Sequence, residues 1–323
     1  MNNFLVFLMI SCALSSIIVG GTNGESPADE KELILQNYPY LVSLYLISFG
    51  HRCTSTIISH TFVMTSAHCL YDFKKRELLN SADLRLVHGA QEMDSSLDHI
   101  TSQPEAEVRH VASVHVHPKF HLDKFYHDIA MLQVDAPWGE RAKLVTIPSF
   151  HVFGNALPKG YVCHVVGWWS TGKCGDMKTV LPSLISGVQY PELRALKQQE
   201  KIPTLNITQM NIIEEDRCTN MVNKNGLLIK EISICTAPKE ADNCDGDPGA
   251  PLICNNLQVG ILSWGLGYKE NGRAMPIVYV RLDNYLYWMD TVVTIFESEA
   301  VMAGPHVVLL ALPMLLAVLE VTL

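Results

Sequence analysis

Histidines gathered in one stretch of the chain are the first residues whose spacing could support chemistry. His115 and His117 are two positions apart, so on a β-strand their imidazoles would lie on one face, as a pair of metal ligands does. No carboxylate or cysteine completes a ligand set around them, and we therefore predict no metal site and no cofactor. The members of the cluster are His110, His115, His117, His121 and His127.

The nine cysteines could form disulfides, bind a metal or carry out redox chemistry. Cys12 lies in residues 1–17, which have no charged side chain, an apolar centre and small residues near the end, and which we predict to be a signal peptide. The alternative is a membrane-anchoring first helix, although the apolar core is short for a span. The eight other cysteines are an even number in an exported chain, which favours four disulfides. No C-x-x-C pair occurs, so a zinc ribbon or a thioredoxin-like site has no support.

Two further features belong to an exported chain. Asn206 begins the only N-x-S/T sequon, and we expect it to be glycosylated if it lies on a surface loop. The second feature is the apolar run at residues 307–319, with small residues before it and no basic residue after it. Residues 298–323 therefore have the order of a lipid-anchor attachment signal. The alternative is a short apolar tail that packs against the domain or a membrane.

Composition limits the class of protein. The chain has 323 residues, 24 basic and 33 acidic side chains and a net charge of −9, and it has no long basic run, which argues against a nucleic-acid partner. Charged residues make up 18% and apolar residues 48% of the chain, which supports a packed core rather than disorder.

The elements that must position any site are mostly short strands. β-Branched and aromatic residues recur in short runs bounded by Gly, Pro, Asn or Ser, which favours an all-β barrel or sandwich over βαβ units. Helical spacing of apolar residues appears near the end of the chain, from Leu282 to Val293, and the polar residues 191–200 are a second helix candidate. The expected strands are 40–48, 55–65, 83–88, 161–167, 259–264 and 277–280.

Four segments match, in order, the trypsin-like serine protease family, which the chain resembles. The matches are IVGG at 18–21, TSAHC at 65–69, DIAML at 128–132 and CDGDPGAPL at 244–252, supported by 163–168, 263–265 and Trp288. The resemblance covers roughly residues 18–295, and we expect a homology domain at 18–297. It implies two antiparallel six-stranded β-barrels with the active site between them and a C-terminal helix.

The resemblance implies a role for each residue of the expected site. His68 corresponds to the general base, Asp128 to the carboxylate that orients it, and Gly246 to one donor of the oxyanion hole. Where the family has its nucleophilic serine, this chain has Pro248, which has neither a hydroxyl nor a backbone N–H. Loss of the nucleophile alone costs on the order of 10⁶ in turnover in a comparable triad enzyme.

Other family positions also depart from the pattern of an active enzyme. Asp242 matches the base of a pocket for Arg and Lys. Ile277 replaces a glycine that lines this pocket together with Ser263, Trp264 and Gly265. We expect Ile277 to fill the pocket. In the family, a cut after Arg or Lys frees an amino terminus that pairs with the aspartate matched here by Asp247. Ile17 precedes residue 18 in this chain, so we expect no trypsin-like enzyme to make that cut.

The family's disulfides can be carried over by match. They imply Cys53–Cys69, Cys163–Cys254 and Cys218–Cys235. The fourth family pair lacks one cysteine here, and Cys174 is left over, so we predict Cys174–Cys244, with two free thiols as the alternative.

Three functions follow as hypotheses. The first is a secreted, catalytically inactive homologue that binds an extracellular protein, such as a protease, an inhibitor or a member of a complex, as cofactor, decoy or adaptor. The second is an active serine endopeptidase of trypsin-like specificity. Pro248 is the residue that distinguishes these two hypotheses. The third is a membrane-attached adhesion or receptor-like protein, which the fate of the tail would distinguish. The long polar segments 71–107 and 172–204 are expected on the rim of the active site, as partner-binding loops or as solvated insertions.

Overall fold

The computed structural model describes most of the chain between residues 27 and 302. The described ranges are 27–93, 96–148, 162–169, 175–176, 203–222, 230–238, 247–265, 268–270, 273–274 and 276–302.

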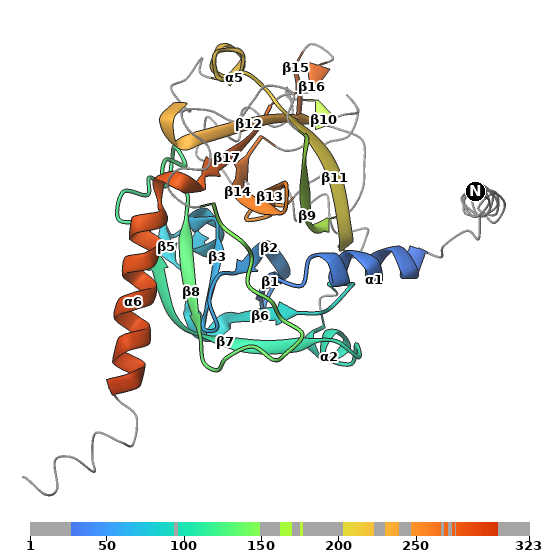
Figure 1. The fold of residues 1–323 in the computed structure, drawn as a ribbon, viewed down its shortest axis with the longest axis vertical. Coiled ribbons are helices and arrows are strands. Elements are labelled where there is room, and N and C mark those ends of the chain that lie inside the picture. Colours follow the sequence, from blue (N-terminus) through green and yellow to red (C-terminus); the bar gives the residue numbers. More distant parts are fainter. Residues whose placement is uncertain are drawn as a thin grey trace, which may run out of the picture.

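The first half of the chain forms a closed six-stranded barrel, in the lower half of Figure 1. Its strands run antiparallel in the order β1-β2-β3-β8-β7-β6. They are β1 (Leu41–Leu46), β2 (Gly50–Ile57), β3 (Phe62–Thr65), β6 (Leu84–His88), β7 (Glu107–Val116) and β8 (Ala130–Val134).

The second half forms another closed six-stranded antiparallel barrel, above the first in Figure 1. Its strand order is β11-β12-β17-β14-β13-β9. The strands are β9 (Val162–Trp169), β11 (Thr204–Ile212), β12 (Ser233–Pro238), β13 (Pro251–Cys254), β14 (Leu257–Trp264) and β17 (Ile277–Arg281).

Each barrel has its own apolar core because alternate residues of a strand point inward. Leu44, Val63 and Leu132 pack inside the first barrel, and Val165 and Tyr279 pack inside the second. A further buried cluster fills the contact between β1 and β9 and includes Trp168. The two barrels therefore pack against each other along this contact.

Helices and short elements surround the barrels. The helices are α1 (Pro27–Asn37), α2 (Leu97–Thr101), α5 (Glu215–Val222) and α6 (Leu286–Met302), with 3₁₀ turns η1 (Ala67–Leu70), η2 (Ser81–Asp83), η5 (Lys230–Ile232) and η6 (Leu282–Asn284). The short strands are β4 (Tyr71–Asp72), β5 (Glu77–Leu78), β10 (Gly175–Asp176), β15 (Tyr268–Glu270) and β16 (Arg273–Ala274).

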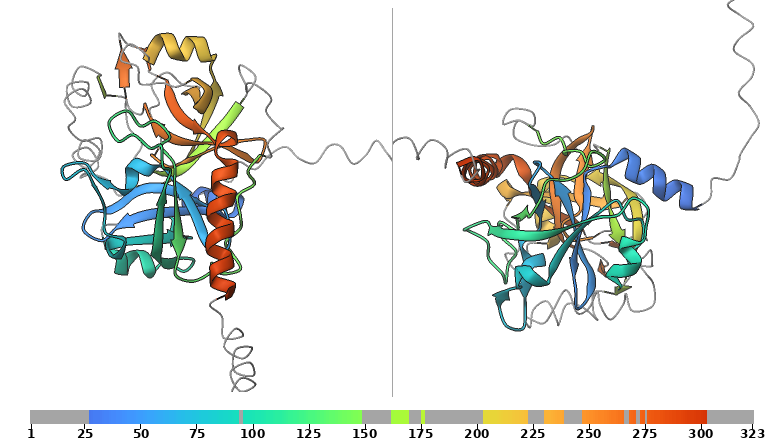
Figure 2. Two further views of the ribbon diagram at one scale, coloured as in Figure 1. Left: turned by 90° about the vertical axis from the view of Figure 1, so that its left-hand side faces the viewer. Right: turned by 90° about the horizontal axis from the view of Figure 1, so that it is seen from below.

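Helix α6 leaves the second barrel and lies along the outside of the first (Figures 1 and 2). Met289 and Val292 pack on Phe62 and Met131, and Glu297 accepts hydrogen bonds from the hydroxyls of residues 59 and 61. Within the part of the chain that the structure describes, no helix is both long and apolar enough to cross a membrane. The predicted signal peptide and apolar tail lie outside the described residues.

The prediction of two antiparallel barrels with a C-terminal helix is confirmed. The single strand expected at 55–65 was wrong, because β2 ends at Ile57 and β3 begins at Phe62 after a tight turn. The polar residues of that turn were too few to break the run of β-branched side chains. Helix α1 was not expected from the sequence, and the helix candidate at 191–200 lies outside the described residues.

Three of the four predicted disulfides are formed. Cys53–Cys69 ties β2 to η1, Cys163–Cys254 ties β9 to β13, and Cys218–Cys235 ties α5 to β12. The pair predicted for Cys174 and Cys244 falls on residues outside the described ranges.

Candidate active site

The expected base and its carboxylate meet between the two barrels. His68 lies in η1, directly after β3, and Asp128 lies just before β8, the neighbour of β3 in the sheet. The His68 backbone N–H donates to Asp128 Oδ1 at 2.8 Å, and His68 Nδ1 lies 2.7 Å from Oδ2. Because a carboxylate only accepts hydrogen bonds, Nδ1 carries the proton and Nε2 is the basic nitrogen of the neutral ring.

A third group completes this pair from the second barrel. Ser263, at the end of β14, donates its hydroxyl to Asp128 Oδ2. Asp128 is fully buried, so each hydrogen bond to it offsets part of the cost of removing a charge from water. The resemblance assigned Ser263 to the specificity pocket, but its hydroxyl points to Asp128.

The turn that contains Pro248 is held by both barrels. The Thr54 N–H in β2 donates to the Pro248 carbonyl at 2.9 Å, and the Gly249 N–H donates to the Leu262 carbonyl at 2.8 Å. Gly249 has φ +81°, and a Cβ there would collide with the Thr54 carbonyl and with Thr65, three residues before His68. Pro248 is thus fixed next to the segment that carries the imidazole, and it presents a saturated ring.

Asp247 already has partners inside the protein. Its carboxylate is fully buried and accepts hydrogen bonds from His51 Nε2, at 2.7 Å, and from the Thr54 hydroxyl. The other ring nitrogen of His51 lies 2.7 Å from the Ser43 hydroxyl, in β1. The family pairs this aspartate with a freed amino terminus; here residues 18–21 lie outside the described ranges, and His51 supplies the neighbouring imidazole.

Ile277 is part of the core of the second barrel. Its side chain is 2% exposed and packs in the cluster that contains Leu252 and Tyr279. Gly265, at φ +105°, lies against its backbone, with the Ile277 Cα 3.0 Å from where a Cβ would be. The side chain therefore packs in the barrel interior, and the expectation that it fills a substrate pocket stays a prediction. Asp242 and Gly246 lie outside the described residues.

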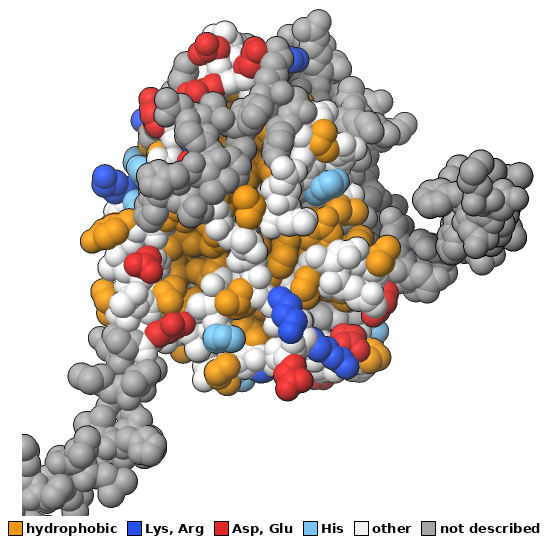
Figure 3. Space-filling view, in the orientation of Figure 1, with side chains coloured by type: hydrophobic (Ala, Val, Ile, Leu, Met, Phe, Trp, Pro, Cys, Tyr) orange, Lys and Arg blue, Asp and Glu red, His pale blue; other side chains and the backbone are white. Residues whose placement is uncertain are grey.

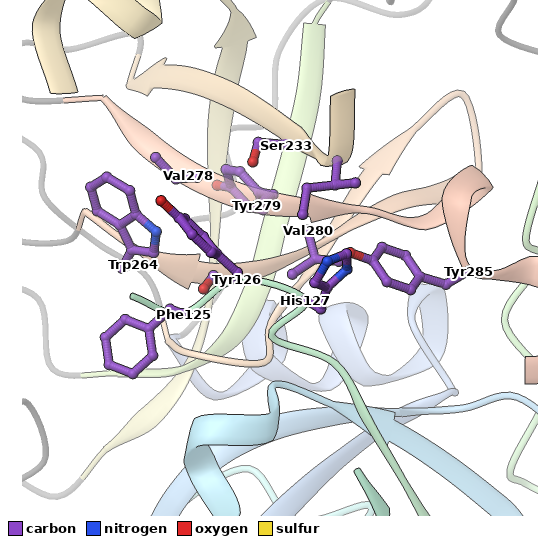
Figure 4. A pocket seen from close by; sticks show the side chains of 11 residues that line it. Phe125, Tyr126, His127, Ser233, Trp264, Val278, Tyr279, Val280 and Tyr285 are labelled. Atoms are coloured by element: carbon purple, nitrogen blue, oxygen red, sulfur yellow. The ribbon is translucent and has the colours of Figure 1, made fainter. Parts of the chain in front are cut away.

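A small cavity lies on the other side of Ser263. Phe125 and His127 line it from the segment before Asp128, and Trp264 and Tyr285 line it from the second barrel and the turn before α6 (Figure 4). Its volume of about 10 Å³ is room for one water molecule at most. It cannot take up a substrate side chain in this conformation.

The clustered histidines pack against α6. The His117 and His127 rings stack at 5.1 Å, His127 Nδ1 lies 3.0 Å from the Tyr285 hydroxyl, and His115 lies 4.3 Å from the Phe296 ring. Of His115 and His117, only His115 lies within β7, because this strand ends at Val116, so the expected shared strand face was wrong. Burial lowers the pKa of all three imidazoles, that of His117 to about 4, where the nearby His127 adds to the effect.

The sequon does not lie on a loop. Asn206 lies within β11 and pairs with Gly167 of β9, and its side-chain N–H groups donate to the carbonyls of Trp169 and Thr204. The condition of a surface loop is therefore not met, because Asn206 lies in a strand that was not among those expected from the sequence. Glycosylation of Asn206 stays a prediction.

Sequence reasoning did not identify His51, Ser43 and Phe125 as residues of this region. Ser43 is a polar residue in the otherwise largely apolar strand β1, which was the one available signal, whereas His51 lies among other polar residues of β2. Phe125 is an ordinary aromatic residue in a polar segment and gave no signal at all.

The chain is similar to trypsins over most of its length. A sequence model of the family described as Trypsin matches residues 30–289. A trypsin of Sarcophaga bullata is 24% identical over 285 residues, which cover 88% of this chain and 95% of that protein. Cationic trypsin-3 of Rattus norvegicus is 24% identical over 298 residues, covering 90% and 97%. The structure of neuropsin, a serine protease expressed in the limbic system of mouse brain, superposes with a TM-score of 0.55 at 23% identity, covering 80% of this chain and 95% of that one.

Proposed function

The chain belongs to the trypsin family of serine-type endopeptidases, and we propose that it is a secreted, non-catalytic member that acts by binding other proteins. The observation that carries the proposal is Pro248. A serine protease needs a hydroxyl that the base can deprotonate and an amide that stabilises the oxyanion. Proline supplies neither, and hydrogen bonds to Thr54 and Leu262 hold its turn in place.

Two further observations support the proposal. Ile277, with a branched side chain that is 2% exposed, stands where the resemblance expects a glycine of the specificity pocket. The bonds from His51 and Thr54 to Asp247 would have to break before an amino terminus could pair with this carboxylate. A buried hydrogen bond to a carboxylate contributes on the order of 1.5–3 kcal/mol, so losing both would be costly.

Secretion and protein binding rest on other features. Three disulfides favour an oxidising compartment, in agreement with the predicted signal peptide. Large apolar side chains are exposed at Ile47 (47%), Phe49 (40%) and Tyr287 (77%), and Figure 3 shows apolar side chains at the surface in the middle of one face. Exposed apolar surface of this kind favours protein partners, and a protease, an inhibitor or another member of an extracellular complex fits the proposal.

The test combines an activity assay with partner capture. The mature protein, secreted from cultured cells and cleared of host proteases, is treated with a fluorophosphonate probe and with Arg, Phe and Ala ester substrates. We expect no labelling and no turnover, together with a saturable partner captured from native extracellular fluid by the folded chain and not by a heat-denatured control. Labelling of the intact protein would support the active endopeptidase instead, for which the intact geometry of His68, Asp128 and Ser263 is the favouring observation.

A further inference from the structure

Two loops of the first barrel close over the His68 imidazole. One is the hairpin β4–β5, residues 71–78, and the other is the segment 120–127, and we call the two together the lid. The Phe125 ring centroid lies 4.9 Å from that of His68, and the Phe73 centroid lies 6.4 Å from it. As a result the His68 residue is only 4% exposed, although it lies at the contact between two barrels and beside a turn that brings no polar side chain to its Nε2.

Three contacts hold the two halves of the lid together. The Tyr71 and Phe120 rings lie 5.4 Å apart, and the Phe73 and Phe125 rings meet edge to face at 6.1 Å. At the outer end, the Arg76 guanidinium donates to both oxygens of Asp123, at 2.7 and 2.9 Å. The aromatic pairs and the bidentate ion pair form a continuous seam above the imidazole.

The closed lid also contains backbone strain. Arg76, Phe125 and His127 adopt φ values of +58°, +52° and +52°, a left-handed region that is unfavourable for L residues of these types. Among the described residues, the other non-glycine positions with positive φ are Asn255 and Asn256, in the two-residue turn between β13 and β14, where asparagine is a favoured residue. Unfavourable backbone conformations are thus concentrated in the loops that cover His68.

We propose that the lid is a conformational gate, seen here closed, that opens to expose His68 Nε2 and the faces of Phe73 and Phe125 to a binding partner. The closed state depends on an exposed ion pair, with Arg76 58% and Asp123 52% exposed, and such pairs contribute little and weaken with salt. Strain at three positions opposes this contact, so the free energies of the closed and open states lie close together. The gate controls access to the His68 imidazole, and the proposal does not depend on whether the chain is catalytic.

The open lid would offer a defined chemistry. An imidazole nitrogen that can accept a hydrogen bond lies next to two phenyl rings. This chemistry suits an aromatic or large aliphatic side chain that carries a nearby N–H or O–H donor. The partner would be a protein segment that presents such a residue. Such a segment would gain access by breaking the Arg76–Asp123 pair.

The test measures access to the imidazole directly. Diethyl pyrocarbonate acylates unprotonated imidazole nitrogens, and peptide mass spectrometry after short exposures of the full secreted chain gives the rate at each histidine. His99, an exposed residue of α2, is the internal reference. We expect His68 to react at least tenfold more slowly than His99, because it reacts only through the open state.

Two variants and one condition separate the gate from a permanently covered residue. Arg76→Gln should raise the His68 rate about threefold, since an exposed ion pair contributes little to the closed state. The control is the neighbouring Lys75→Gln, which also removes one positive charge and should leave the His68 rate unchanged. Phe125→Gly should raise the rate at least tenfold, because glycine adopts φ +52° without strain and removes only the ring. For Phe125→Gly, the control is Leu78→Ala, which shortens an exposed side chain in the hairpin half of the lid.

Salt gives a test on the unmodified protein, which does not depend on the folding of a variant. Raising the ionic strength from about 0.05 to about 0.5 M should raise the His68 rate relative to His99 in the natural chain and not in Arg76→Gln. Equal rates at His68 and His99 in the natural chain would show that the lid is not closed in solution. A slow His68 rate that neither salt nor Arg76→Gln changes would show a fixed cover, even if Phe125→Gly raises the rate by removing the ring, and either result overturns the proposal.

Discussion

The proline ring at position 248 changes two properties of the site at once. It removes a hydroxyl next to His68, and it removes a backbone N–H from the turn that the Thr54 and Leu262 bonds hold. The base, its carboxylate and the Ser263 hydroxyl keep the geometry of a working assembly. At the scale of single residues, therefore, the proposal of a non-catalytic site rests on Pro248 and not on the geometry of the His68–Asp128 pair.

Pro248→Ser should not restore useful activity. The change returns the hydroxyl and the amide, but Ile277 remains in the barrel core, Phe125 still covers His68, and Asp247 keeps its bonds to His51. Productive catalysis requires the substrate carbonyl near 3 Å from the nucleophile, which a filled pocket does not provide. Hydrolysis of Arg esters and fluorophosphonate labelling measure the outcome.

Pro248→Ala is the matched control, because it restores the same amide without the hydroxyl. Turnover that appears in the serine variant and is absent in the alanine variant would mean that the remaining obstacles, Ile277 above all, matter little.

Gly249→Ala should destabilise the protein by at least about 2 kcal/mol. A Cβ at φ +81° is strained, and here it would also strike the backbone of Thr54 and the hydroxyl of Thr65, which cannot move without opening the contact between barrels. Urea unfolding followed by tryptophan fluorescence gives the change. Gly139→Ala is the control, because its Cβ would meet only the flexible end of Glu107 at 3.1 Å, and it should change stability by less than about 0.5 kcal/mol. Similar losses for both variants would show that the turn is less constrained than its contacts indicate.

At the scale of elements, helix α6 is held by an apolar face and by imidazoles. Met289 and Val292 pack on the outside of the first barrel, and the rings of His117 and His127 contact Tyr285, with His117 also 5.0 Å from Trp288. These rings contact one another and the helix while neutral. Protonation would put two positive charges in contact, with Lys119 adding to the repulsion.

Acid should therefore weaken the docking of α6. In the unfolded chain these histidines titrate near pH 6.5, while burial lowers the pKa of His117 to about 4 in the folded protein. The unfolded state then binds more protons below pH 6.5, so stability is complete above that pH and is lost as the pH falls toward 4. We expect the thermal midpoint to fall over this range, and His117→Phe to reduce the fall because the ring contact remains while the proton site is removed. Carboxylates titrate equally in both proteins, so the difference isolates His117.

His99→Gln, at an exposed position of α2, is the control and should follow the natural chain at every pH. A His117→Phe protein whose midpoint falls as steeply as that of the natural chain would show that this imidazole does not carry the pH dependence.

At the scale of the whole molecule, three disulfides tie elements close to the site. The Cys53–Cys69 bond joins β2, whose Thr54 holds the Pro248 turn, to η1, which carries His68. We predict that Cys174 and Cys244 form a fourth bond, because eight cysteines in an exported chain favour complete pairing. Alkylation without reduction, followed by peptide mapping, should find no modified cysteine in the mature protein. Modified Cys174 and Cys244 would reject this pair and leave the other three standing.

The tail gives a second prediction at this scale. Helix α6 ends at Met302, and the apolar run follows in the sequence at 307–319. We expect the residues after about Gly304 to be removed for lipid attachment or inserted in a membrane. Surface staining of secretory cells with and without phosphatidylinositol-specific phospholipase separates the two: release indicates a lipid anchor, and retention indicates insertion. Soluble protein in the medium with its tail intact by mass spectrometry would contradict both.

The sequence by itself determined those features that depend on residue type and order along the chain. The order of the TSAHC, DIAML and CDGDPGAPL segments was enough to predict two barrels, the His68–Asp128 pair and the three observed disulfides, and the loss of a nucleophile is evident from the proline itself. Short strands with β-branched residues also identified most of the sheet. The long run at 55–65 misled because its turn has no glycine or proline.

Only the tertiary structure decided which groups meet across long separations. His51 and Asp247 are 196 residues apart, and Ser263 and Asp128 are 135 apart, so these hydrogen bonds exist only once both barrels have closed and packed. The cover of Phe73 and Phe125 over His68 likewise depends on the conformation of two polar loops, which side-chain pattern does not specify. Local sequence pattern reports the burial of a strand face, whereas the partner of a buried polar group is set by the register and packing of elements distant in the chain.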